Sequence, residues 1–147
     1  MRSSTGRARV REALLRYVEA RADALASARR ELGLGEGDAR ALLHISDNPG
    51  IRPTQLRDHL GITSAGVTAL IDRLAERGIV RREPDEDDRR VSRITLTVDL
   101  AEDPWSVLTR FDSDFDVAVD AVAEDECVTF SDLLESLTSA TLERSRA

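Results

Sequence analysis

The chain of 147 residues is long enough for one compact domain with a modest core, and its 41% hydrophobic and 33% charged residues are typical of a soluble, helix-rich protein. The sequence has no apolar run of membrane-spanning length, no signal-peptide core and no Cys/His cluster with metal-ligand spacing, so we expect a cytoplasmic protein without a metal. The net charge of −7, taken alone, argues against a nucleic-acid partner.

The N-terminal part of the chain predicts two helices. Apolar residues recur at helical spacing from about Ala8 to Leu32, and the glycine-rich segment 33–37 ends this long helix. A second helix is expected from about Asp38, its predicted N-cap, to Asp47, after which Asn-Pro-Gly breaks it. The chain therefore begins with one long and one shorter amphipathic helix.

A helix-turn-helix is predicted next. Pro53 suits the first turn of a short helix that ends at Leu60. Gly61 makes the turn, and Thr63 or Ser64 caps the following helix. The apolar stripe of that helix consists of Val67, Leu70, Ile71 and Leu74. A short helix, a glycine turn and a longer capped helix are the pattern of a motif whose second helix enters the major groove of DNA.

Two strands around a charged turn follow this motif. Residues 79–83 are a predicted strand, residues 84–90 (PDEDDRR) are a polar turn, and residues 91–98 (VSRITLTV) are a second strand rich in β-branched residues. A hairpin directly after a recognition-type helix is typical of the wing in a winged helix-turn-helix.

The C-terminal part predicts two further helices. From Pro104, one apolar stripe extends through Trp105 to Val122, and another runs from about Val128 to Leu137, with an acidic segment between them. The predicted fold class is therefore mainly α with a small β-hairpin wing (α+β), in which terminal helices flank a winged helix-turn-helix.

The central residues resemble a known family. Residues 88–97 (DRRVSRITLT) match the wing pattern D-x-R-x-x-x-x-x-L-T of the MarR family of multiple-antibiotic-resistance-type regulators. The preceding GITSAGVTALIDRLAERGIVRR is similar to that family's recognition helix and first wing strand. The resemblance implies an N-terminal dimerisation helix at residues 1–34, a winged helix-turn-helix DNA-binding domain at 35–99, and C-terminal dimerisation helices at 100–147.

The same resemblance implies a function. A MarR-type chain is expected to be a transcriptional regulator that binds double-stranded DNA sequence-specifically as a homodimer. Its operator is expected to be near-palindromic, because two identical modules read two half-sites. The resemblance further implies a ligand-responsive repressor with a small aromatic effector, for which no pocket residues are assigned, and no other cofactor.

The predicted base contacts lie on the exposed face of the recognition helix. They are Thr63, Ser64, Ala65, Thr68 and Arg73. Small hydroxyl and methyl groups can approach base edges closely, including the methyl group of thymine. An ordinary capped helix with small residues on its solvent face would account for the same residues, so this alternative stays open.

The resemblance also implies a minor-groove contact from the wing. One arginine, Arg90 or its neighbour Arg89, would enter the groove, and Asp88 would orient its guanidinium through a bidentate pair. The alternative is a solvated charged turn, because four acids at positions 85–88 surround these arginines and would repel phosphate unless they pair with arginine or point outward. Further candidates for phosphate contacts are Arg52, Arg57 and Arg77.

The charge is unevenly distributed along the chain. Residues 52–98 carry nine arginines and eight acids, whereas residues 99–147 carry three arginines and thirteen acids, so the middle of the chain tolerates a polyanion. The acidic total favours one alternative function, a winged-helix module that binds protein and not DNA. An enzyme is not expected, because the sequence has no phosphate loop, nucleophile elbow or paired-carboxylate signature.

Two histidines and a cysteine complete the candidate functional residues. His44 and His59 are isolated in the sequence, and Cys127 lies among apolar residues, so we expect structural or surface roles for all three.

Overall fold

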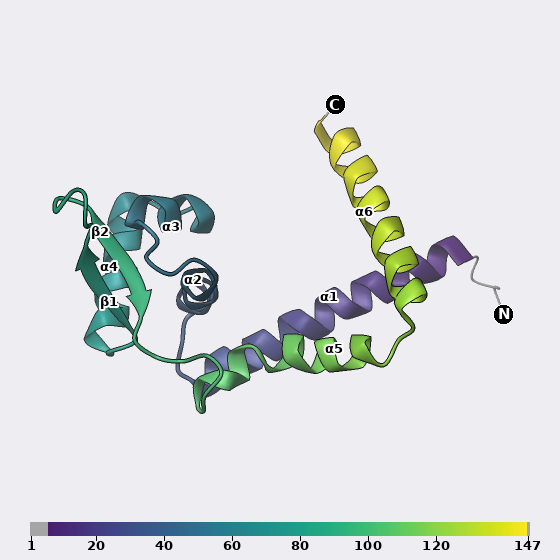
Figure 1. Ribbon diagram of the computed structural model, residues 1–147, viewed down its shortest axis with the longest axis horizontal. Helices are drawn as coiled ribbons and strands as arrows, with labels where there is room; N and C mark the ends of the chain where they lie inside the picture. The colour runs from purple at the N-terminus through teal and green to yellow at the C-terminus, as the bar shows by residue number, and fades with distance from the viewer. Residues whose placement is uncertain (1–5, 147) are drawn as a thin grey trace. The chain divides into compact units, whose positions relative to one another are not determined.

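The computed structural model describes residues 6–146, which fall into two compact units that divide after Phe111. The first unit contains α1 (Gly6–Glu31), α2 (Glu36–Asp47), α3 (Pro53–Leu60), α4 (Ser64–Glu76), β1 (Val80–Pro84) and β2 (Ser92–Leu96), all labelled in Figure 1. It also contains the 3-10 turn η1 (Trp105–Leu108). The second contains most of α5 (Arg110–Asp120) and all of α6 (Glu124–Arg146). The predicted fold class is confirmed, while the three-part division at residues 34 and 99 stays a prediction.

Local chemistry sets the ends of α2 and α3. Gly35 is the N-cap of α2, so the prediction that Asp38 caps this helix is wrong. Asp38 lies inside the first turn and is only 5% exposed, and its carboxylate pairs with Arg73 of α4. Pro53 begins α3, as expected, and Gly61 ends α3 with φ 67°, a left-handed conformation that favours glycine.

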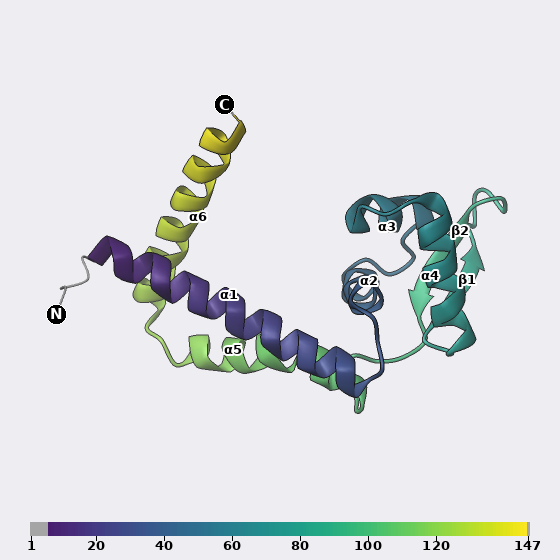
Figure 2. The same cartoon turned by 180° about the vertical axis from the view of Figure 1, so that it is seen from behind.

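The core of the first unit lies between α2, α3, α4 and the hairpin. Its largest fully buried side chains are Leu42, Ile45, Leu56, Ile71, Leu74, Ile79 and Ile94. The two strands pair antiparallel, with Val80 opposite Leu96, and the hairpin lies beside α4 in both views (Figures 1 and 2). The backbone N–H of Ile94 also donates a 2.8 Å hydrogen bond to the carbonyl of Ile51. The wing is therefore attached to the segment that leads into α3.

The helix predicted from Trp105 to Val122 is interrupted in the structure. Residues 105–108 form η1, which contacts α1 and places Leu108 in the core, and α5 begins only at Arg110. Neither α5 nor α6 contains a buried residue. Across residues 6–146, no helix combines the length and the apolar character that crossing a membrane requires.

Candidate nucleic-acid interface

Helix α4 has one buried face and one exposed face. Val67, Leu70, Ile71 and Leu74 are each at most 5% exposed and face the core. Ser64, Ala65 and Thr68 lie on the opposite, exposed face, as the helical repeat of about 3.6 residues requires. The structure therefore leaves the predicted recognition surface accessible, and its contact with DNA stays a prediction.

Thr63 holds the first turn of α4. Its Oγ1 accepts a 3.0 Å hydrogen bond from the backbone N–H of Gly66, so Thr63 and not Ser64 is the N-cap. A Cβ on residue 66 would lie only 3.1 Å from this Oγ1. The capping geometry thus explains a glycine early in the helix, where helix propensity alone disfavours it.

The hydroxyl groups on the exposed face already have partners. The Oγ of Ser64 accepts a 3.3 Å hydrogen bond from Nη1 of Arg57, and the Oγ1 of Thr68 donates one of 3.0 Å to the carbonyl of Ser64. Arg57 also donates two hydrogen bonds, of 2.8 and 2.7 Å, to Oδ1 of Asp58. These bonds hold the guanidinium of Arg57, a predicted phosphate contact, beside the N-terminus of α4.

Two further arginines of the predicted interface have intramolecular roles. The guanidinium of Arg73 binds the Asp38 carboxylate of α2 through Nε and Nη2, with the Nε–Oδ2 distance at 3.2 Å. This hydrogen bonding and the charge of Asp38 raise the pKa of Arg73. Arg77 donates to the carbonyls of Leu32 and Gly33, at 2.9 and 3.1 Å, beyond the C-terminal end of α1. Arg73 attaches α4 to α2, and Arg77, just after α4, binds the turn that follows α1. Their contact with DNA stays a prediction.

The turn of the wing is organised by Asp85, which in the sequence is one of four consecutive acids at positions 85–88. Asp85 is 2% exposed, and its Oδ1 accepts hydrogen bonds from the backbone N–H groups of Asp87 at 2.9 Å and Asp88 at 3.4 Å. Its Oδ2 lies 2.7 Å from Nη2 of Arg93 and 3.5 Å from Nη2 of Arg52.

These contacts also perturb the titration of Asp85. The hydrogen bond from the backbone of Asp87 is the largest cause and lowers the pKa of the Asp85 carboxyl. Burial raises this pKa, while the hydrogen bond from Asp88 and the charge of Arg93 lower it. One signal was present in the sequence, because an aspartate at the start of a turn commonly accepts a hydrogen bond from the backbone two residues on. The two arginine partners, however, lie in other elements and leave no such local signal.

The wing arginines are exposed in the same turn. Oδ1 of Asp88 accepts a 3.0 Å hydrogen bond from the backbone N–H of Arg90. Within residues 6–146, Asp88 makes no ion pair with Arg89 or Arg90, so the bidentate pair expected at the minor groove of DNA stays a prediction. Asp88 shapes the turn through the backbone. Within residues 6–146, the guanidinium groups of Arg89 and Arg90 make no ion pair, which leaves both available for an external partner.

The segment that contains α4 and the wing turn is similar to a known protein family. Residues 32–91 match the model of the MarR family. This segment is a MarR-family winged helix. It begins just after α1, includes α2, α3, α4 and β1, and ends in the wing turn at Val91. The resemblance seen in the sequence is thereby confirmed, and the MarR match supports a DNA-binding transcriptional regulator.

Solved structures share the fold of this chain. A mutant of MepR from S. aureus bound to an oligodeoxyribonucleotide is 19% identical, covers 88% of this chain and 96% of its own, and has a TM-score of 0.58. A MarR family protein from Bacillus stearothermophilus is 22% identical, with coverages of 89% and 92% and a TM-score of 0.64. A transcriptional regulator from Thermotoga maritima is 23% identical, with coverages of 95% and 99% and a TM-score of 0.59. No curated protein matches the chain by sequence.

The two histidines, which are isolated in the sequence, contact each other in the structure. The rings of His44 in α2 and His59 in α3 stack with their centroids 3.5 Å apart and their planes 4° from parallel. Burial lowers the pKa of His44, and His59 lowers it further, against the charge of Asp47. The pair therefore joins α2 to α3 and favours a neutral His44.

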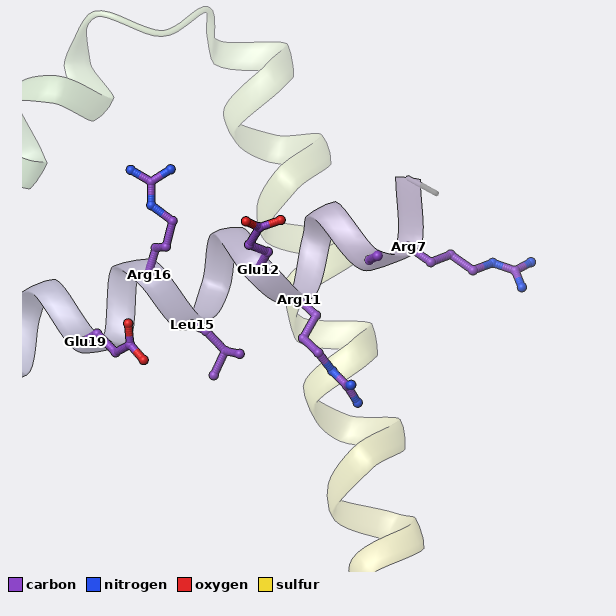
Figure 3. A pocket seen from close by; sticks show the side chains of 7 residues that line it. Arg7, Arg11, Glu12, Leu15, Arg16 and Glu19 are labelled. Carbon is purple, nitrogen blue, oxygen red and sulfur yellow. The ribbon is translucent and has the colours of Figure 1, made fainter. Parts of the chain in front are cut away.

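Among the described residues, 6–146, no pocket is assigned to the effector, which stays a prediction. One hollow is lined entirely by side chains of α1, which spread outward from the helix in Figure 3. Its polar lining residues are Arg7, Arg11, Glu12, Arg16 and Glu19. Because the aromatic effector implied by the resemblance needs a largely apolar, concave site, this charged surface of a single helix does not fit it.

Proposed function

We propose that this protein is a ligand-responsive repressor that binds a near-palindromic operator in double-stranded DNA as a homodimer. One observation carries the proposal: the exposed small side chains of α4 belong to the same compact unit as a hairpin turn that presents Arg89 and Arg90 without an intramolecular ion pair among residues 6–146. The MepR structure from S. aureus, which has the same fold, is bound to an oligodeoxyribonucleotide and supports DNA as the ligand. The small aromatic effector rests on the family resemblance.

The chemistry of α4 favours particular base edges in the major groove. Ala65 and Thr68 carry methyl groups that suit contact with the methyl of thymine. Because the hydroxyl of Thr68 donates its hydrogen to the carbonyl of Ser64, its oxygen acts toward DNA as an acceptor. The amino groups of adenine and cytosine are the donors that such an acceptor meets in the major groove.

The second unit supports a dimer. Its exposed large apolar side chains are Phe115, Val117, Val119, Val122, Val128, Phe130, Leu133, Leu137 and Leu142. An extensive exposed apolar surface is typical of an interface. A second copy is the proposed occupant, because two identical modules are needed to read the two half-sites of a palindrome. The acidic character of residues 99–147 keeps this unit clear of DNA phosphate.

The proposed function is tested by selecting DNA with the full chain from random duplexes of about 30 base pairs, which accommodate two half-sites one helical turn apart. We expect enrichment of an inverted repeat whose affinity, measured by gel shift, falls steeply as salt increases. A shuffled duplex of the same composition is the control and should bind about 1,000-fold more weakly. Binding to no duplex would contradict the proposal and favour the protein-binding alternative.

Replacing Arg90 by alanine is expected to weaken binding to the selected duplex. The slope of log affinity against log salt should become shallower by about one unit, because one contact with the DNA backbone or groove is lost. Gel-shift titrations at several salt concentrations measure both quantities. Arg81→Ala is the matched control, since Arg81 lies in β1 with its Nε 2.6 Å from a Glu83 oxygen. Unchanged affinity and slope in R90A would remove Arg90 from the contact set.

A further inference from the structure

The carboxylate of Asp85 joins three separate parts of the winged helix. Its Oδ1 holds the backbone of the wing turn, and its Oδ2 faces both Arg93 of β2 and Arg52, the residue immediately before α3. The carboxylate is 2% exposed, whereas the side chains of Arg52 and Arg93 are 48% and 42% exposed. A nearly buried anion thus lies beneath two guanidinium groups that reach the surface.

The partners of Asp85 are themselves anchored near α3. Arg93 donates a second hydrogen bond, of 3.1 Å, to the carbonyl of Gly50. The backbone N–H of Gly50 donates to the carbonyl of Ile94 at 3.0 Å, next to the bridge between Ile94 and Ile51. Segment 50–52 and the base of the wing therefore share backbone and side-chain contacts, and the Asp85 carboxylate extends these contacts to the tip of the turn.

We propose that Asp85 is the positioning residue of the wing: it fixes the turn that carries Arg89 and Arg90 against the start of α3, and so sets the place of the wing arginines relative to the recognition helix. This inference rests on the proposed DNA-binding function. The 2.7 Å contact makes Arg93 the structural partner. The Nη2 of Arg52 lies 3.5 Å from Oδ2 of Asp85, and the Arg52 side chain is more exposed than that of Arg93. The guanidinium of Arg52 therefore stays available for phosphate.

The inference and simple electrostatics predict opposite effects of one substitution. If Asp85 were only an anion near DNA, its neutralisation would reduce repulsion of phosphate and tighten binding. If Asp85 positions the wing, Asp85→Asn removes the charge that holds Arg93 and Arg52 and displaces the wing arginines. Binding then weakens although the protein becomes more positive. We expect a loss of about tenfold or more in affinity, since hydrogen bonds to charged groups are among the stronger ones.

The experiment measures binding of the duplex selected by the wild-type full chain, for D85N and for two comparison variants. Asp87→Asn removes the same charge from the same turn, at an exposed side chain, and should bind as tightly as wild type or slightly tighter. Arg93→Lys preserves the charge but loses the planar fork that reaches both Asp85 and the Gly50 carbonyl, and should weaken binding as D85N does. Urea unfolding of each variant shows that the protein binding the duplex is folded.

Hydrogen exchange of the free protein separates this inference from the proposed function. In D85N, the backbone amides of Asp87 and Asp88 should exchange faster than in wild type, while amides in the core of α4 keep their protection. If the wild-type chain binds no duplex, the DNA-binding function fails, and unchanged exchange in the turn would still overturn the positioning role. Equal or tighter duplex binding by folded D85N, matching D87N, would overturn the inference as well.

Discussion

Replacing Leu133 and Leu137 together by glutamate is expected to convert the dimer to a monomer and to weaken operator binding about 100-fold or more, since the second module no longer binds at high effective concentration. These side chains are 52% and 43% exposed on α6, one helical turn apart, where they form part of the proposed interface. Burying two carboxylates in an apolar interface is strongly unfavourable. Light scattering after size-exclusion chromatography gives the oligomeric state, and titration of the selected duplex gives the affinity.

The control for this variant carries the same added charge on another face of α6. Ser136→Glu with Ser139→Glu places two glutamates on the face of α6 that carries Asp132 and Glu143, because the helix has about 3.6 residues per turn. This double variant should remain dimeric and bind the duplex as wild type does. A dimeric L133E/L137E protein would show that this part of α6 lies outside the interface.

Replacing Ile71 by alanine is expected to lower the free energy of unfolding by about 2–5 kcal/mol, a large fraction of the stability of a typical domain. Ile71 is 0% exposed in the centre of the buried face of α4, so the loss combines reduced burial with a cavity. Urea unfolding followed by circular dichroism measures the change.

Thr68→Ala on the exposed face of the same helix is the matched comparison. We expect its stability to lie within about 0.5 kcal/mol of wild type, because the residue packs against no core. Its affinity for the selected duplex should nevertheless fall, since a methyl group and an acceptor are lost from the recognition surface. A stable I71A protein together with a strongly destabilised T68A protein would contradict the orientation of α4.

The helix-turn-helix and the wing could be predicted from the sequence because their signals are local. Pro53, Gly61 and Thr63 act on backbone groups within about four residues of themselves, through a fixed φ, a left-handed turn and a cap. The β-branched residues of segment 91–98 similarly indicated the strand, in which Ile94 is buried. The apolar stripe of α4, which runs from Val67 to Leu74, likewise indicated which face of the helix is exposed.

The sequence is least informative about carboxylates that can accept hydrogen bonds from any of several donors. Asp38 has the residue type of an N-cap, but α2 begins two residues earlier, at Glu36, and the Asp38 carboxylate binds Arg73 from 35 residues away. Asp88 could have paired with a wing guanidinium, yet it accepts a hydrogen bond from the backbone of Arg90. The sequence shows where an aspartate is present, but it does not show from which of several donors its carboxylate accepts a hydrogen bond.

The sequence by itself determined the order of the elements, the turns that separate them and the surface that α4 exposes, because periodicity and capping depend on neighbours along the chain. Only the tertiary structure decided that Asp85 lies buried between Arg52 and Arg93, that Arg77 binds carbonyls beyond the end of α1, and that His44 stacks on His59. These contacts join residues of different elements, so they exist only after the helices and the hairpin have packed together.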